Sequence, residues 1–163
     1  LNERNKPKKQ LNMNIQPQIQ IKALEQISQP EWLFLWQDYQ RFYQAQISDE
    51  VSENTWDKLT NYELDSMYGF AAMMDGKVVG IVHVIEHNSS WTIRPYAYLQ
   101  DLFVHPDYRG RGVARKLLEH IYQVAQQRNC DRVYWLTQES NHQAQALYNK
   151  VAKKTGFIQY RMD

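Results

Sequence analysis

The segment between residues 104 and 116 has the residue types and spacing with the clearest chemical meaning. It lies between a strand-like run and a helix-like run and carries two glycines and four basic residues: Arg109, Gly110, Arg111, Gly112, Arg115 and Lys116. Glycines let backbone amides approach a ligand closely, and the free N–H groups at the start of a helix attract anions. The segment therefore predicts a cradle for a diphosphate.

Two common phosphate-binding motifs do not fit this segment. A P-loop needs the pattern Gly-x-x-x-x-Gly-Lys-Ser/Thr, which is absent. A dinucleotide fingerprint needs a third glycine where Arg115 stands, and Asp131 precedes the next strand instead of following it. On spacing alone, a solvated basic loop is as good an interpretation as a binding site.

A wider set of residues resembles one enzyme superfamily. The pattern Arg109-x-x-Gly112-x-Ala114 is similar to the acyl-CoA signature of the GNAT acetyltransferases, Gln/Arg-x-x-Gly-x-Gly/Ala. Further features occur in the family's order and spacing: Val78-Val79-Gly80, Trp135, Asn141, Ala146-Leu147-Tyr148 and Gly156-Phe157. The resemblance spans residues 18–161, and the run from Tyr98 to Val104 is especially similar to the polyamine acetyltransferase branch.

The resemblance implies an α/β domain with the GNAT fold, a mixed, mostly antiparallel sheet flanked by helices. It implies an acetyl-CoA-dependent N-acetyltransferase that acts on a primary amine of a small molecule or a lysine-like side chain, including a peptide lysine. Acetyl-CoA would be the acyl donor. The alternative is a GNAT-fold sensor or regulatory module that binds acyl-CoA without turnover.

The resemblance also implies roles for individual residues. The backbone near Leu102, Phe103 and Val104 would pair with the pantetheine arm of the donor, and Asn141 would contact the same arm. The diphosphate would be held by the loop residues Arg109, Gly110, Arg111, Gly112, Val113 and Ala114. Tyr148 would be the acid that protonates the departing sulfur, and Tyr98 and Gln100 would bind the acceptor.

The general base is where the sequence departs from the polyamine branch, because Gln100 stands in place of a glutamate. A base is needed, since only about one amine in a thousand is neutral at pH 7. Strand alternation predicts that Tyr98, Gln100, Leu102 and Val104 share one face and Asp101 the other, which argues against Asp101. The candidates are therefore His83, His87, a carboxylate of residues 49–65 acting through water, or no dedicated base.

Acidic and aromatic residues upstream offer an acceptor site. Residues 49–65 contain six acidic residues and only Lys58 as a base, and we expect either a solvated helix face or an acidic lip that favours a cationic acceptor. The apolar positions of residues 31–46 recur every three or four residues, which indicates a helix. Its aromatic residues are expected to help shape the acceptor pocket: Trp32, Trp36, Tyr39 and Tyr43.

The spacing of apolar residues and the positions of turn-forming residues predict the remaining helices and strands. A hairpin is predicted around Asp75-Gly76, a helix over residues 112–127 and another over 141–154. Strands are predicted at 18–23, 96–104, 132–137 and 157–161, and Ser52 or Asn54 is a candidate cap for a helix that contains Trp56. Little chain is left for the seventh strand usual in the family, so that edge is either open or completed by a second subunit, as in a homodimer.

The composition of the chain limits the classes of function and the kinds of site that remain. The chain has 163 residues, 43% apolar, with a net charge of +1, which gives no general support for nucleic-acid binding. Cys130 is the only cysteine, so an intrachain disulfide and a cysteine-based zinc site are excluded, and no metal is expected. No apolar run is long enough to span a membrane, and we expect a cytoplasmic protein. Residues 1–12 are interpreted as a flexible or added extension, and residues 13–163 as a single domain.

Overall fold

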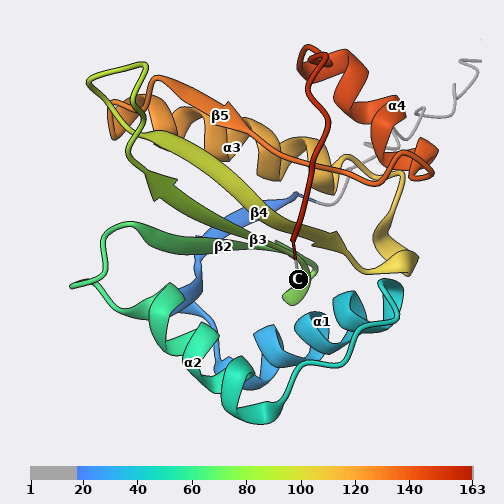
Figure 1. Ribbon diagram of the computed structural model, residues 1–163. Helices are drawn as coiled ribbons and strands as arrows, with labels where there is room; N and C mark the ends of the chain where they lie inside the picture. Colours follow the sequence, from blue (N-terminus) through green and yellow to red (C-terminus); the bar gives the residue numbers. More distant parts are fainter. Residues whose placement is uncertain (1–17, 163) are drawn as a thin grey trace, which may run out of the picture.

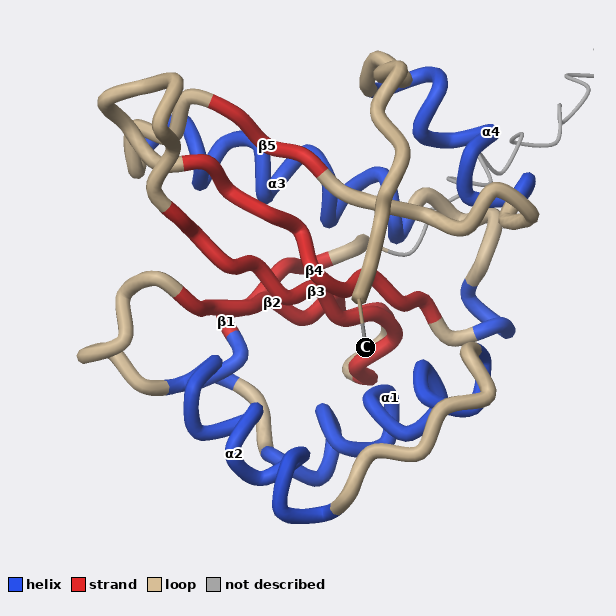
Figure 2. Tube along the Cα trace, in the orientation of Figure 1, coloured by secondary structure: helices blue, strands red, loops and turns tan. Residues whose placement is uncertain are grey.

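Residues 18–162, which the computed structural model describes, form one five-stranded sheet in the order β1-β2-β3-β4-β5 (Figures 1 and 2). Neighbouring strands are antiparallel except β4 and β5, which are parallel. The strands are β1 (Gln20–Ala23), β2 (Met67–Met74), β3 (Lys77–His87), β4 (Tyr96–Val104) and β5 (Arg132–Tyr134). The predicted mixed, mostly antiparallel α/β fold is confirmed. The predicted extension at residues 1–12 lies outside the described residues.

Helices cover both faces of this sheet (Figure 1). The helices are α1 (Gln29–Phe42), α2 (Asp49–Thr60), α3 (Val113–Gln127) and α4 (His142–Val151), with short 3-10 turns η1 (Leu24–Gln26) and η2 (Pro106–Tyr108). On the α1 face, Trp32 and Leu35 are fully buried against Ile81 and Phe103. On the other face, α3 buries an apolar stripe against the sheet: Val113, Leu117, Leu118, Ile121 and Ala125. None of the helices within residues 18–162 is long and apolar enough to span a membrane.

Local signals account for most element boundaries. Ser28 and Glu31 form a capping box at the start of α1. Asp75 and Gly76 both have positive φ, 51° and 75°, as a tight hairpin turn between β2 and β3 requires. The predicted cap of α2 was wrong: Ser48, whose Oγ accepts from the Val51 amide, begins that helix instead of Ser52 or Asn54.

Two predictions about the C-terminal part were wrong. β5 ends at Tyr134 instead of residue 137, because it diverges from β4 beyond Tyr98. Residues 157–161 were predicted as a strand but belong to no strand in the single chain. Apolar and polar residue types nevertheless alternate there, as they do in a strand with one apolar face. This segment is drawn in dark red in Figure 1, where it leads away from α4 and runs at a steep angle to β5.

β4 contains a bulge that changes which residues share a face. His83 pairs with Asp101 but Val84 pairs with Leu99, so Gln100 is an extra residue without a partner on β3. Leu99 and Leu102 consequently both pack on the α3 face, and Asp101 lies on the α1 face beside His83. The prediction that Tyr98, Gln100, Leu102 and Val104 share one face was therefore wrong.

Candidate functional site

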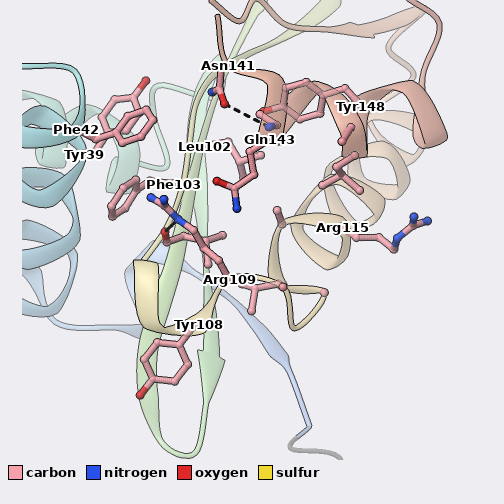
Figure 3. A pocket seen from close by; sticks show the side chains of 18 of the residues that line it. Tyr39, Phe42, Leu102, Phe103, Tyr108, Arg109, Arg115, Asn141, Gln143 and Tyr148 are labelled. Carbon is pink, nitrogen blue, oxygen red and sulfur yellow. Dashed lines mark hydrogen bonds between the residues drawn. The ribbon is translucent and has the colours of Figure 1, made fainter.

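A cavity of about 440 Å³ lies where the end of α1, the end of β4, the start of α3 and α4 meet (Figure 3). Ten residues predicted from the sequence line it: Leu102, Phe103, Val104, Arg109, Gly110, Gly112, Val113, Ala114, Asn141 and Tyr148. Three others, Arg111, Gln100 and Tyr98, do not line it. The cavity therefore brings the basic loop, the end of β4 and α4 together.

The loop end of the cavity has the properties of an anion site. Gly110 and Gly112 have φ of 73° and 84°, which a residue with a Cβ adopts only with strain. Gly112 caps α3 without a side chain, so no side chain occupies the free amides of the first turn. Arg115 and Lys150 also line the cavity and add positive charge. The loop end of the cavity can therefore accept an anion.

Arg109 contacts residues of two elements that line the cavity. Its Nε donates a hydrogen bond of 3.0 Å to the carbonyl of Val104, and its guanidinium lies 5.4 Å from the ring of Phe42 and 5.6 Å from that of Phe103. These contacts join the loop to β4 and α1. Arg111 instead lies over the ring of Tyr108, at 5.3 Å, which explains why it is not part of the cavity lining.

The split between β4 and β5 leaves backbone groups for an extended ligand. The two strands pair only at Tyr96–Tyr98 of β4, so the remainder of β4 up to Val104 has no strand partner on that side within residues 18–162. An extended thioester arm can hydrogen-bond to such an edge as an added strand would. Leu102, Phe103 and Val104 are the residues of this edge that line the cavity.

α4 forms the wall opposite α1. Asn141 caps this helix, and its Oδ1 accepts a hydrogen bond of 3.2 Å from the Ala144 amide (dashed line in Figure 3), which leaves its NH₂ group for a ligand. The ring of Tyr148 packs edge-on against Trp135 at 5.3 Å. Burial, with a contribution from nearby Tyr43, raises the pKa of Tyr148 to about 12, so its hydroxyl is a proton donor at neutral pH.

The aromatic residues of α1 divide into two groups. Tyr39, Phe42 and Tyr43 line the cavity, and they are called the α1 wall below. Trp32 and Trp36, also expected at the acceptor pocket, are buried in the core instead, 0% and 5% exposed. Tyr39 and Phe42 lie in the last turn of α1 and Tyr43 directly follows it, so only this end of the helix reaches the cavity.

Asp101 lies close to two residues of the α1 wall, Tyr39 and Tyr43. Burial raises the pKa of Tyr39, and the nearby Asp101 carboxylate raises it further. The same carboxylate lies 2.9 Å from Nδ1 of His83, a fully buried side chain. Trp32 Nε1 donates to His83 Nε2 at 2.9 Å, so His83 carries its proton on Nδ1 and donates it to Asp101. The sequence argument against Asp101 therefore fails because of the bulge at Gln100.

The other candidate bases lie elsewhere. His87 is on the exposed end of β3, where its Nε2 is 2.7 Å from the Tyr134 hydroxyl, and it does not line the cavity. No residue of the acidic stretch 49–65 lines the cavity either, so the expected acidic lip is not found there. Residues that the sequence did not single out do line it, among them Phe42, Tyr108, Gln143 and Lys150. Within residues 18–162, no group of His, Cys, Asp or Glu is arranged to hold a metal.

Known proteins are similar to this chain in sequence. The family model described as "Acetyltransferase (GNAT) family" matches residues 21–152. The chain is 34% identical to the D-amino-acid N-acetyltransferase HPA3 of Saccharomyces cerevisiae over 157 residues, 95% of this chain and 94% of the yeast protein. It is 29% identical to the thialysine N-epsilon-acetyltransferase of Caenorhabditis elegans over 116 residues, 68% of this chain and 72% of that protein.

Solved structures agree on the fold. The structure of AAC(6')-Iy in complex with the bisubstrate analogue CoA-S-monomethyl-acetylneamine matches with a TM-score of 0.76 at 19% identity, over 90% of this chain and 98% of that chain. The fold, the anion-binding loop beside a split sheet and the family match lead to one assignment. The chain belongs to the acetyltransferase (GNAT) family, and its activity is acyl-CoA-dependent transfer of an acetyl group to an amine.

Proposed function

We propose that this enzyme transfers acetyl from acetyl-CoA to a small primary amine, foremost the amine of a free amino acid, with Asp101 as the general base. The observation that carries the proposal is the 2.9 Å contact between Asp101 and His83, with Tyr39 of the α1 wall close to the same carboxylate. Two relatives are named for amino-acid amines, the yeast D-amino-acid enzyme and the nematode thialysine enzyme. A peptide lysine is the second acceptor to test.

The acceptor amine would lie between the α1 wall and Tyr148, at the end of β4. Bound acetyl-CoA supplies the acetyl group as a thioester. The amides after Gly112 and the NH₂ group of Asn141 hold the donor, and the free edge of β4 aligns it along Leu102–Val104. A backbone N–H at this edge would donate to the thioester oxygen as negative charge develops there.

Proton transfer from the amine would pass through Tyr39 to Asp101. The amine gives a proton to the Tyr39 oxygen while the Tyr39 hydroxyl gives its own proton to the carboxylate, so Tyr39 ends neutral and Asp101 ends protonated. His83 donates from Nδ1 to Asp101 and keeps the carboxylate oriented. His83 is a positioning residue in this scheme, since Asp101 and Trp32 occupy its two ring nitrogens.

Departure of the sulfur would be assisted by Tyr148. As the C–N bond forms and the C–S bond breaks, negative charge collects on the sulfur, and the Tyr148 hydroxyl donates to it. A pKa of about 12 keeps this hydroxyl protonated throughout the physiological range. Gln100 thus does not deprive the enzyme of a base, which removes the reason for interpreting the chain as a binding module without turnover.

Thiol release from acetyl-CoA tests this proposal. The panel of acceptors is D- and L-amino acids, thialysine, polyamines, aminoglycosides and lysine peptides, each at neutral and mildly alkaline pH. Release with amino acids at the highest kcat/KM is the expected result. Higher kcat/KM with lysine peptides would move the acceptor to proteins, and tight donor binding without release with any amine would overturn the proposal. A cytoplasmic location and self-association, both expected from the sequence, are also part of the proposal.

A further inference from the structure

A stripe along α1 contacts the loop that joins β4 to α3 (residues 105–112, called the β4–α3 loop below). Phe34, Asp38 and Phe42 are four residues apart, so they lie one above another on the same side of the helix. Phe34 is 55% exposed and Phe42 is 48% exposed, so burial in the core does not account for their position. Each residue of the stripe instead contacts a side chain of the β4–α3 loop.

His105 and Arg109 make these contacts from the loop. The His105 ring stacks on Phe34 at 6.1 Å between ring centres, and its Nε2 lies 3.8 Å from Oδ2 of Asp38. The Arg109 guanidinium lies 5.4 Å from the ring of Phe42. Figure 3 shows the Arg109 side chain directed toward the α1 wall. The loop proposed to hold the diphosphate is therefore connected to the helix that ends in the α1 wall.

Arg109 also occupies the last carbonyl on the free edge of β4. The His105 amide donates to the Val79 carbonyl of β3, so the alternation of an antiparallel pair directs the N–H and C=O of Val104 the other way, to the open side. Arg109 Nε donates to that Val104 carbonyl at 3.0 Å. An extended donor arm can then pair with the Val104 N–H and with the backbone groups of Leu102. The same guanidinium thus borders the path of the donor and the α1 wall.

The end of α1 is not anchored in the core. No residue from 41 to 46 is buried, and Gln44 has a positive φ of 53°. The backbone amides of residues 43–45 donate to carbonyls within the final turn of the same helix. Helix ends with few buried contacts open more readily than the core. A contact that holds Phe42 therefore also determines how often the α1 wall is in place.

We propose that Arg109 is a positioning residue that couples the donor side of the cavity to the acceptor side. Through Phe42 it links a donor-bound β4–α3 loop to a closed α1 wall, and His105 supports this link through Phe34 and Asp38. A donor that fixes the loop thereby favours the closed wall. By reciprocity, an amine bound at the wall favours the loop position that binds the donor, so each ligand raises the affinity for the other. The effect on the amine rests on the proposed function, whereas the effect of the donor on α1 requires only that an acyl-CoA binds this loop.

Amide hydrogen exchange tests the link with the donor side alone. CoA is the probe, so neither an acceptor nor turnover is needed. In the wild type, saturating CoA should slow exchange at residues 43–45 by about fivefold or more, and in Arg109→Met and Phe34→Ala by less than about twofold. Phe34 does not line the cavity, so Phe34→Ala removes a contact with the loop without removing one with the ligand. Val51→Ala, at a similarly exposed apolar residue of α2, is the control and should behave as the wild type.

Two results of this experiment would overturn the proposal. One is exchange in the wild type that CoA does not slow. The other is slowing that persists in Arg109→Met or in Phe34→Ala, because CoA would then act on the end of α1 without the loop contacts. If Arg109→Met does not fold, Phe34→Ala decides in its place.

Calorimetric titration of CoA, with and without the amine that gives the highest kcat/KM in thiol release, measures the coupling. In the wild type, saturating amine should lower the Kd for CoA about tenfold, within the usual range for two coupled sites. Arg109→Met should reduce this ratio to less than about twofold. Arg111→Met removes an equal charge from the same loop, but its guanidinium lies over Tyr108 instead of α1, so the ratio should be kept.

A ratio near one in the wild type, a ratio unchanged in Arg109→Met or a ratio lost in Arg111→Met would overturn the coupling, whatever the variants do to the Kd itself. If no amine is acetylated, the proposed function fails, and the hydrogen-exchange experiment decides on the link between the loop and α1.

Discussion

Nδ1 of His83 lies 2.9 Å from Oδ2 of Asp101, on neighbouring antiparallel strands and on the side of the sheet that faces α1. This contact exists because the bulge at Gln100 turns Asp101 toward α1. Asp101 is only 12% exposed at its side chain, where it contacts His83 and lies near Tyr39 of the cavity wall. A carboxylate at that position can receive a proton from the cavity without losing its orientation.

Asp101→Asn is expected to lower kcat/KM about 10²- to 10⁴-fold, the usual loss when a general base is removed. The amide keeps the shape of the side chain but accepts no proton, so proton transfer from the amine to residue 101 should be lost. Steady-state rates with the preferred acceptor amine measure this. Asp75→Asn is the control, because asparagine tolerates the same left-handed turn conformation far from the cavity. An unchanged kcat/KM in Asp101→Asn would contradict the assignment.

Trp32→Phe is expected to affect activity through His83. The substitution keeps an aromatic ring in the core but removes the donor to Nε2, leaving a buried acceptor unsatisfied at a cost of about 1–3 kcal/mol. kcat should fall by about tenfold, less than in Asp101→Asn, with little change in KM, and the melting temperature should fall. A melting-temperature decrease with unchanged kcat would show that the Trp32–His83 contact serves stability alone.

The sequence predicts the donor side of the site better than the acceptor side, and the reason is local. Arg109, Gly112 and Asn141 act through loop geometry and helix caps, which depend on residues a few positions away. The acceptor side depends on pairing between distant strands. The residues on either side of Gln100 do not indicate an extra residue in β4. The simple alternation of side chains along a strand therefore places Asp101 on the wrong face of the sheet.

Helical period has a similar limit in α1. Trp32, Trp36, Tyr39 and Tyr43 recur at positions that share one side of a helix, and the period cannot tell where along that side the core ends. The structure shows Trp36 within the core and Tyr39 at the cavity, one turn apart. The strand predicted at residues 157–161 fails for a related reason, since alternation indicates a strand but not what it pairs with.

Tyr148→Phe is expected to lower kcat by about 10- to 100-fold while the Kd for acetyl-CoA stays within about twofold, because the lost hydroxyl is the proposed donor to the departing sulfur. The raised pKa of Tyr148, about 12, favours the neutral hydroxyl, so its donor function is retained as pH rises and is lost only near pH 12. kcat of the wild type should therefore show no decrease from this group up to pH 10. Tyr122→Phe, on the exposed side of α3, is the matched control. Equal kcat in both variants would remove Tyr148 from the mechanism.

Cys130 is expected to react slowly with alkylating reagents in the folded protein. Burial, with a contribution from Glu86, raises the pKa of its thiol to about 11. At pH 8 the thiolate fraction is then about two hundred times lower than for an ordinary thiol of pKa near 8.5. Iodoacetamide labelling followed by mass spectrometry measures the rate, with the urea-unfolded chain as reference. Equal rates in the folded and unfolded chain would contradict the raised pKa.

Gly112→Ala is expected to weaken acetyl-CoA binding beyond its effect on stability. Gly112 and Gly76 both have positive φ, 84° and 75°, so alanine at either position should cost about 1–2 kcal/mol of folding free energy. Only Gly112 lies at the first turn of α3, where an added Cβ would enter open space at the loop proposed to hold the diphosphate. Calorimetric titration should show a Kd raised about tenfold or more in Gly112→Ala and unchanged in Gly76→Ala, at similar losses of melting temperature. Equal Kd values in the two variants would place the diphosphate away from this loop.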